Sequence, residues 1–132
     1  MKVAFATTNG RDVDEHFGRA DMFGVYEMTQ EGYQFVEIRH VADVMEKPLD
    51  ESKEELEAHD SKAIRRVESL ADCKIVYLTE IGGPMAARLA KYGIMPIKVK
   101  EVVSIEESLE KLYETVKLSP PIWLKRALQQ NG

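Results

Sequence analysis

The 132-residue chain contains very little cysteine and no long apolar run. Its single cysteine, Cys73, excludes an intrachain disulfide. No window approaches the roughly 18 apolar residues that a membrane-spanning helix needs. The chain also lacks a basic excess, because 18 Lys and Arg face 23 Asp and Glu and the formal net charge is −5. These shortages argue against nucleic-acid and membrane partners.

What the chain does contain is typical of one globular domain. Hydrophobic residues make up 44% and charged residues 31% of the sequence. A chain of this length can bury enough surface to fold without a disulfide or a structural metal. The first eight residues carry one positive charge and no long apolar run, which indicates a strand and not a signal peptide. We therefore expect a single domain, residues 1–132, in the reducing cytoplasm.

Apolar patterning predicts strands and helices in the order β-β-β-α-β-α-β-α. A hairpin turn at residues 29–32 makes two strands antiparallel, whereas the later strands alternate with helices as in parallel βαβ units. This order predicts an α/β fold in which helices cover both faces of a mixed five-stranded sheet, a three-layer α/β/α arrangement. The predicted strands are the run around Val3 and Phe5, then 22–28, 33–41, 74–79 and 94–99, and the predicted helices are one ending near Leu70, then 85–92, 104–116 and 122–129.

Two local signals refine these elements. Phe35, Ile38 and Val41 do not share one parity in the third strand, so we expect a bulge there. Ser104, followed three residues later by Glu107, has the pattern of a capping box.

The chain ends in a predicted tail helix within residues 117–132. Pro120 and Pro121 interrupt the preceding helix. The short apolar stripe that follows needs a surface to cover, either its own domain or a partner. The charge-dense segment 42–62 is predicted to be an exposed connection running into a helix.

Two loops carry the candidate site, residues 14–20 after the first strand and residues 81–84 after the buried strand 74–79. If these strands are parallel neighbours, both loops emerge at the carboxyl edge of the sheet, where open α/β sheets bind ligands. Gly82 and Gly83 let the backbone approach a ligand closely, and their amides with the following helix N-terminus suit an anion. The alternative interpretation is a tight strand-to-helix turn without a ligand.

His16 is the histidine at this edge, and its imidazole can ligate iron, zinc or copper or act as a base. The alternative is a solvent-exposed or capping histidine. Neighbouring Phe17 and Gly18 would supply an apolar contact and a freely bending backbone. Arg19 and Arg88, the latter one turn into the next helix, can add positive charge. The predicted site comprises His16, Phe17, Gly18, Arg19, Gly82, Gly83 and Arg88, with His16 as the metal ligand.

Other reactive side chains are predicted to lie outside this site. Cys73 begins the buried strand, so roughly 20 Å of strand separates it from the His16 edge, and we expect a buried, dispensable thiol. Asp12, Asp14 and Glu15 could form a metal-dependent nuclease cluster, but two-metal hydrolysis needs carboxylates from several elements. A solvated acidic loop fits their spacing better.

Six motifs follow one another along the chain: KVAFATT at 2–8, VDEHFG at 13–18, DC at 72–73, IGGPMAARL at 81–89, GIMPIKV at 93–99 and PPIWLKRAL at 120–128. Together they resemble the NifX/NafY family of nitrogenase cofactor-binding proteins, also called the dinitrogenase iron–molybdenum cofactor biosynthesis domain. The resemblance covers nearly the whole chain except residues 44–62. The tail is similar to that of NifX members.

The resemblance implies a fold related to ribonuclease H, with a five-stranded sheet between helices. It also implies a non-enzymatic carrier, without catalytic residues, for the iron–molybdenum cofactor or its iron–sulfur precursor, with His16 as a ligand. Its partners would be assembly proteins, a NifB-type donor and a NifEN-type scaffold. A conventional iron–sulfur site needs about four thiolates, so a cluster held by a chain with one cysteine would arrive preassembled.

Two further hypotheses remain open from the sequence. A metal-dependent phosphodiesterase of ribonuclease H type would use Asp12 and Asp14. A protein-interaction module would use the Pro-Pro-Ile-Trp-Leu tail, residues 120–124, to dock onto an assembly scaffold.

Overall fold

The computed structural model describes residues 1–41, 58–118 and 120–129, with the backbone alone for residues 58–62. The predicted charged connection lies largely outside these described residues. The strands of the main sheet and the helices fall within about two residues of their predicted bounds. The strands are β1 (Lys2–Ala6), β3 (Met22–Thr29), β4 (Gly32–His40), β5 (Cys73–Leu78) and β6 (Met95–Lys98), and the helices are α3 (Ala58–Ser69), α4 (Gly83–Lys91), α5 (Ile105–Leu118) and α6 (Ile122–Gln129).

The main sheet is five-stranded and mixed, with the strand order β4-β3-β1-β5-β6. β1 pairs antiparallel with β3 and parallel with β5, β5 pairs parallel with β6, and β3 and β4 form an antiparallel hairpin. The predicted mixed sheet is confirmed, and its order is compatible with a ribonuclease H-like arrangement. Because β1 and β5 run side by side in one direction, the loops that follow them emerge at the same edge.

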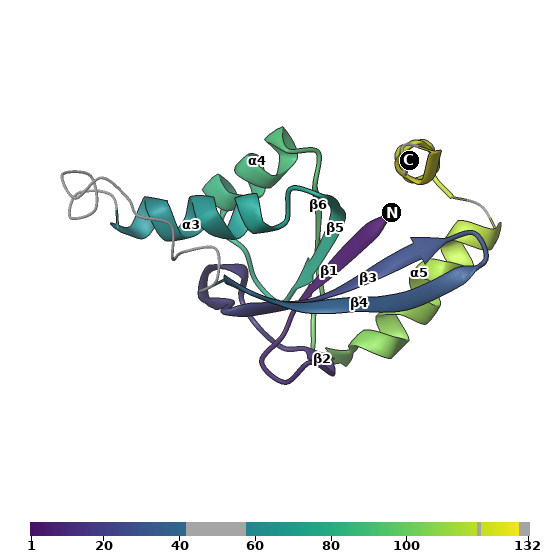
Figure 1. The fold of residues 1–132 in the computed structure, drawn as a ribbon, viewed down its shortest axis with the longest axis horizontal. Coiled ribbons are helices and arrows are strands. Elements are labelled where there is room, and N and C mark those ends of the chain that lie inside the picture. The colour runs from purple at the N-terminus through teal and green to yellow at the C-terminus, as the bar shows by residue number, and fades with distance from the viewer. Residues whose placement is uncertain (42–57, 119, 130–132) are drawn as a thin grey trace.

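Helices cover both faces of this sheet, as predicted (Figure 1). Side chains alternate between the faces along β1, as the period of a strand requires. Ala4 and Ala6 belong to the core beneath α3 and α4, whereas Val3 and Phe5 belong to the core beneath α5 and α6. The central strands are therefore buried on both sides, which makes their ends the places where the sheet can meet a ligand.

The predicted bulge lies in β4. Val25 of β3 pairs with Glu37, and the next residue, Tyr26, pairs with Phe35, so Val36 is the extra residue. The shift exchanges the faces of the β4 side chains, which explains why the apolar positions lacked a common parity.

A second, two-stranded sheet was not predicted. β2 (Asp12–Val13) pairs antiparallel with β7 (Val103–Ser104). Two-residue strands are too short to show a period, and about 90 residues of chain separate them. The pairing ties the loop after β1 to the start of α5, where Ile105 N donates to Arg11 O at 2.8 Å.

The predicted helix ends are largely confirmed. Pro84 lies in the first turn of α4, and Gly93 follows that helix at φ 74°, in the left-handed region. Ser104 Oγ accepts a hydrogen bond from Glu107 N at 3.0 Å. The carboxylate of Glu107 faces Lys111 Nζ at 3.8 Å, so the structure shows the serine half of the capping box.

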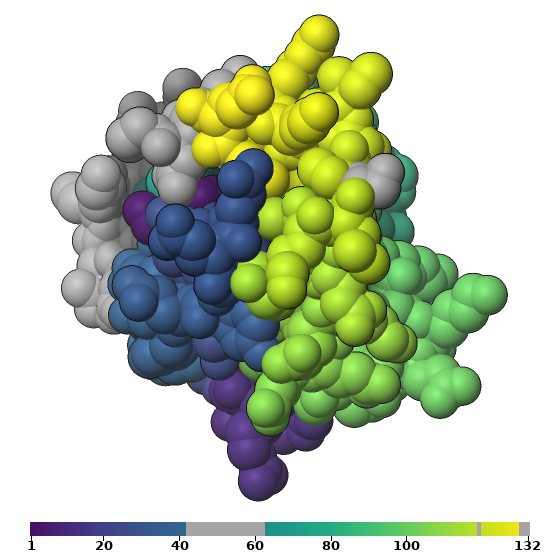
Figure 2. All heavy atoms as spheres, turned by 90° about the vertical axis from the view of Figure 1, so that its right-hand side faces the viewer, coloured from purple at the N-terminus to yellow at the C-terminus, as the bar shows by residue number. Residues whose placement is uncertain are grey.

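The tail helix α6 packs on its own domain. Leu124 and Ala127 are buried in the same core cluster as Met1 and α5. In Figure 2, α6 (yellow) lies beside the β3–β4 hairpin (blue) and next to α5. Trp123 remains 40% exposed. None of the described helices is long and apolar enough to cross a membrane.

Candidate functional site

The loop after β1 is held by its own polar side chains. Thr7 Oγ1 accepts a hydrogen bond from Gly10 N at 2.9 Å, and Asn9 Oδ1 accepts bonds from Arg11 N at 2.8 Å and Asp12 N at 2.9 Å. Gly10 has φ 77°, a conformation that side chains other than glycine rarely adopt. These bonds give the first half of the loop one conformation before it reaches the candidate site.

The second half of the loop pairs with the end of β5. Thr79 N donates to Glu15 O at 3.1 Å, and Phe17 N donates to Glu80 O at 2.9 Å. His16 and Glu80 thereby form a parallel bridge. The predicted meeting of the two loops at the carboxyl edge is confirmed, since Gly18 and Gly82 each follow this bridge by two residues.

Phe17 differs from the other predicted site residues because its ring lies in the core. It is fully buried and packs against Phe23, with ring centroids 5.9 Å apart. The ring is therefore directed into the core, and a contact of Phe17 with a ligand stays a prediction. Phe17 starts the short 3-10 helix η1 (Phe17–Arg19) and anchors the loop, leaving Gly18 and Arg19 exposed. The exit of the loop is tied to α3, where Arg66 Nε donates to Ala20 O at 2.9 Å.

Three glycines at this edge are not required by the backbone conformation or packing of the described residues. Gly82 is the N-cap of α4 at φ −77° and ψ 152°, an extended conformation that any residue adopts. A Cβ built on Gly18 or Gly83 would meet nothing within 4 Å, and one on Gly82 would meet only the ring of Pro84 at 3.9 Å. All three are exposed. Neither the backbone conformation nor the packing of the described residues requires glycine here, and the missing side chains leave room for close approach to the backbone.

Two of the predicted arginines are not used by the part of the fold that the structure describes. Arg19 and Arg88 make no ion pair or hydrogen bond with any residue that the structure describes. The first turn of α4 adds backbone amides and the positive end of the helix dipole. Arg66 and Arg39, by contrast, are both bonded to other parts of the fold. The edge thus combines uncommitted cations, exposed amides and one imidazole, which suits an anion with a metal atom on its surface.

An ion pair borders His16. Lys98 Nζ, at the end of β6, lies 3.1 Å from both carboxylate oxygens of Glu80. The hydrogen bond and charge of Lys98 lower the pKa of Glu80, with a smaller contribution from His16. Lys98 therefore balances a carboxylate that would otherwise repel an anion beside His16.

The acidic residues of the loop serve the loop itself. Asp14 accepts hydrogen bonds from the backbone and the hydroxyl of Thr8, and Asp12 accepts one from Asn9 Nδ2 at 2.8 Å. Within residues 1–41, 58–118 and 120–129, no group of three or more His, Cys, Asp or Glu side chains is placed to hold a metal ion. Asp12 and Asp14 are thus engaged in hydrogen bonds within their own loop.

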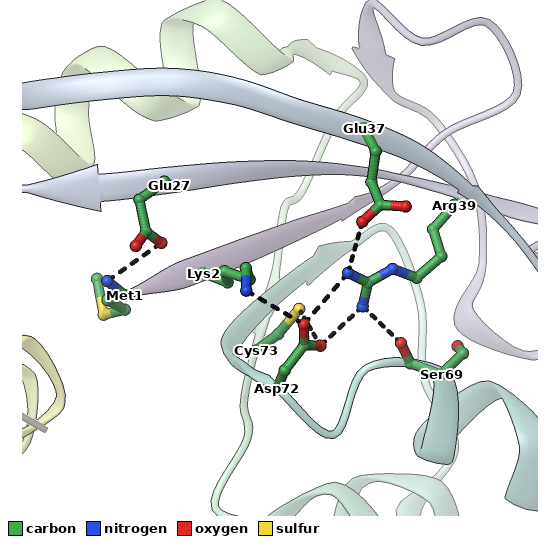
Figure 3. A network of polar contacts seen from close by, with 8 residues as sticks. All are labelled: Met1, Lys2, Glu27, Glu37, Arg39, Ser69, Asp72 and Cys73. Atoms are coloured by element: carbon green, nitrogen blue, oxygen red, sulfur yellow. Dashed lines mark hydrogen bonds and ion pairs between the residues drawn. The ribbon is translucent and has the colours of Figure 1, made fainter. Parts of the chain in front are cut away.

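Cys73 lies at the other end of β5 from His16, which confirms the predicted strand direction. It pairs with Lys2 at the start of β1, and seven residues of chain, roughly 20 Å, separate it from Glu80. Burial raises the pKa of its thiol to about 12, with a further contribution from Asp72 (Figure 3). The buried thiol thus lies at the opposite end of the strand from the candidate site.

Sequence reasoning missed three residues that form this site. Glu80 and Lys98 follow two neighbouring parallel strands, a signal that the predicted topology could have supplied. Arg66 gives no such signal, because its bond to Ala20 O depends on the packing of α3.

Taken together, the fold and this edge define an open-sheet α/β domain with a polar, glycine-lined site at the carboxyl ends of its parallel strands. Residues 1–115 match the family described as "Dinitrogenase iron-molybdenum cofactor". The chain belongs to this family.

Named relatives agree with this assignment. The chain is 33% identical to "Protein NifX" of Sinorhizobium fredii over 132 residues, covering 100% of this chain and 80% of the relative. It is 35% identical to "Protein NifX" of Herbaspirillum seropedicae over 130 residues, covering 98% and 83%. It is also 30% identical to the "FeMo cofactor biosynthesis protein NifB" of Bradyrhizobium diazoefficiens over 106 residues, covering 80% of this chain but 20% of that protein.

Proposed function

We propose that this protein takes part in biosynthesis of the nitrogenase iron–molybdenum cofactor, as a carrier that binds the cofactor or its iron–sulfur precursor without transforming it. The cluster is the cargo and is released to the next protein. Family membership supports the pathway, and the similarity to NifX and NifB proteins points to the same cargo.

The observation that carries the proposal is the set of exposed glycines at the bridge between the two loops. Gly18, Gly82 and Gly83 are not required by the conformation or by the packing of the described fold. A large rigid cluster needs a surface without side chains so that backbone amides can reach its outer atoms. Sulfide-containing clusters are hydrogen-bond acceptors, and the amides before and within the first turn of α4 are donors.

His16, Arg19 and Arg88 have different proposed roles in binding the cluster. The imidazole of His16, exposed and without a hydrogen bond to the described residues, supplies a nitrogen ligand to a metal atom. Arg19 and Arg88 supply charge-assisted hydrogen bonds to an anionic cargo. Few strong ligands and many weak donors allow both binding and release, as a carrier requires. NifB-type donors and NifEN-type scaffolds are the proposed partners, and the reducing cytoplasm is the proposed location.

Replacing His16 tests the proposal. His16→Ala should weaken binding of isolated iron–molybdenum cofactor by about a hundredfold in an anaerobic titration, because it removes a metal ligand. The thermal midpoint should stay within about 2 °C, since the side chain makes no bond that the described fold uses. His40→Ala, which removes an exposed histidine at the end of β4, is the matched control. Equal affinity of the His16 and His40 variants would remove His16 from the site.

A further inference from the structure

A second concave surface lies at the opposite end of the sheet from His16. It is a groove of 420 Å³ bounded by the start of β5, the α4–β6 connection and α6. We call it the tail groove, and its lining includes Lys74, Ile94, Met95, Pro96, Trp123 and Arg126. Met95 and Trp123 are each 40% exposed, so two large apolar side chains border open space.

Lys74 and Arg126 are the basic residues in the lining of the groove, and the two segments that border it contain no acidic residue. Residues 81–100 and 115–132, which supply α4, β6 and α6, contain seven of the 18 Lys and Arg residues and none of the 23 Asp and Glu residues. The remaining sequence therefore carries a formal charge of about −12 against +7 for these two segments. Two acid-free segments far apart in the sequence meet at one groove.

The cations that line the groove are available to a partner. Lys74 and Arg126 make no ion pair or hydrogen bond with any residue in the part of the chain that the structure describes. Ala90, Ile94 and Ala127 add apolar residues to the same lining. Basic side chains around an apolar groove are complementary to an acidic segment that carries one large apolar residue.

We propose that the tail groove binds an acidic peptide segment of a partner protein, with an apolar side chain of that segment seated between Trp123 and Met95. An extended polyanion such as nucleic acid or a membrane surface would also face the strongly acidic remainder of this chain, which repels it. A short peptide engages the groove alone. The site lies at the amino ends of β5 and β6, so a partner held there leaves the carboxyl edge of the sheet accessible.

Peptide selection tests the chemistry of the occupant. Random dodecapeptides displayed on phage are selected on the immobilised whole chain, with the Lys74→Glu/Arg126→Glu double variant as the counter-target. Enriched sequences should combine several Asp or Glu residues with Leu, Phe or Trp. Enrichment of basic or uncharged sequences, or none above the counter-target, would overturn the proposal.

Trp123 provides the second measurement, because it is the only tryptophan in the chain. A synthetic enriched peptide should shift its emission to shorter wavelength as the ring is covered. Lys74→Glu/Arg126→Glu should raise Kd by about tenfold or more, and added salt should raise the wild-type Kd as well. Circular dichroism checks that the variants are folded.

Matched controls separate the groove from a general charge effect. Arg11→Glu/Lys111→Glu changes the net charge equally at exposed sites elsewhere and should leave Kd within about twofold. Equal weakening by both pairs would overturn the proposal. So would a larger Trp123 response to phosphatidylglycerol vesicles or to a 20-nucleotide single-stranded RNA than to the peptide.

Discussion

The two ends of the β1–β5 strand pair use their polar residues differently. Asp72 and Ser69, at the amino end of β5, are bonded to the side chain of Arg39, which extends toward them from β4 (Figure 3). Its guanidinium donates to Asp72 and to Ser69 O, both at 2.7 Å, and to Glu37 at 3.1 Å. At the carboxyl end, His16 and Arg19 are exposed and Arg88 is half-buried, and their side chains make no such bonds within the described chain.

The difference teaches which end stabilises the fold and which end is open to a ligand. The Arg39 side chain is only 16% exposed, and its network connects β4 to the α3–β5 turn. The carboxyl end is held by backbone bonds between residues 15–17 and 79–80. Its side chains are therefore free to contact a ligand without weakening the fold.

The largest expected effect is on binding at the carboxyl end. Arg19→Gln/Arg88→Gln should weaken binding of the isolated cofactor by about a hundredfold, because two charge-assisted contacts are lost. Stability should be nearly unchanged, since neither side chain has a partner in the described fold. Anaerobic titration and urea unfolding measure the two quantities, with Arg11→Gln/Lys111→Gln as the control. Unchanged affinity would mean that these arginines do not face the cargo.

The opposite result, a loss of stability without a loss of binding, is expected from a substitution in the Arg39 network. Arg39→Met should lower the free energy of unfolding by about 2 kcal/mol, since it leaves the Ser69 carbonyl and two carboxylates without this donor. Cofactor affinity should stay within about twofold, because the network is roughly a strand length from His16. Urea unfolding compares it with Arg11→Met at an exposed site. A loss of affinity in a folded Arg39→Met protein would break the division between the two ends.

The stability contributed by the contact between Arg39 and Asp72 should depend on pH in the acid range. Burial would raise the pKa of Asp72, but the hydrogen bond and charge of Arg39, helped by Lys2, hold it below its ordinary value of 3.8. A lowered folded pKa means that the contribution to stability is present above that value and is lost as the pH falls through the folded pKa. The stability difference between wild type and Arg39→Met should therefore shrink below about pH 4.

The two ends of α4 allow a sharper comparison. Gly83→Val should weaken cofactor binding by about tenfold, because a side chain would occupy the space needed for close approach. Gly83→Ala should weaken it less and should not destabilise, since alanine is the better helix former. Gly93→Ala, at φ 74°, should cost about 1 kcal/mol of stability and leave binding unchanged. Differential scanning calorimetry and titration of all three variants check the pattern, and wild-type affinity of Gly83→Val would make Gly83 merely structural.

The smallest effect is expected at Cys73. Cys73→Ala should cost about 1 kcal/mol of stability and leave cofactor binding unchanged. Because burial raises the folded pKa of the thiol to about 12, from 9.0, its contribution is full below pH 9 and is lost as the pH rises toward 12. The alkaline fall in stability should therefore be shallower for Cys73→Ala. Rapid alkylation of the native thiol at pH 7 would contradict the burial.

Deletion of the tail is likewise predicted to lower stability without changing cofactor affinity. Removing residues 120–132 should leave cofactor affinity nearly unchanged but should lower stability, because Leu124 and Ala127 belong to the core. Loss of cofactor binding by a truncated protein that still folds would place the tail in the site.

Much of the fold, and the meeting of the two candidate loops, followed from local pattern. The run around residues 74–79 is apolar on both faces because β5 is covered by helices on both sides. The Gly82-Gly83-Pro84 sequence predicted a strand-to-helix turn, and its meeting with the His16 loop followed from parallel neighbours. The order of residues along the chain carries this information, since backbone conformation and side-chain period are local properties.

Tertiary structure decided what depends on distant partners. Three contacts join residues that are far apart in sequence: the β2–β7 pairing, the bond from Arg66 to Ala20 O and the ion pair of Glu80 with Lys98. No periodic pattern in the sequence predicts them. The burial of the Phe17 ring, and the packing of α6 on its own domain, were likewise open until the layers were in place. By itself the sequence determined the elements, the order that makes the sheet mixed, and the two loops at its edge. Only the tertiary structure decided which arginines bond to other parts of the fold and which have no partner among the described residues. The reason is that the partners of an arginine are residues distant in sequence, which packing brings into contact.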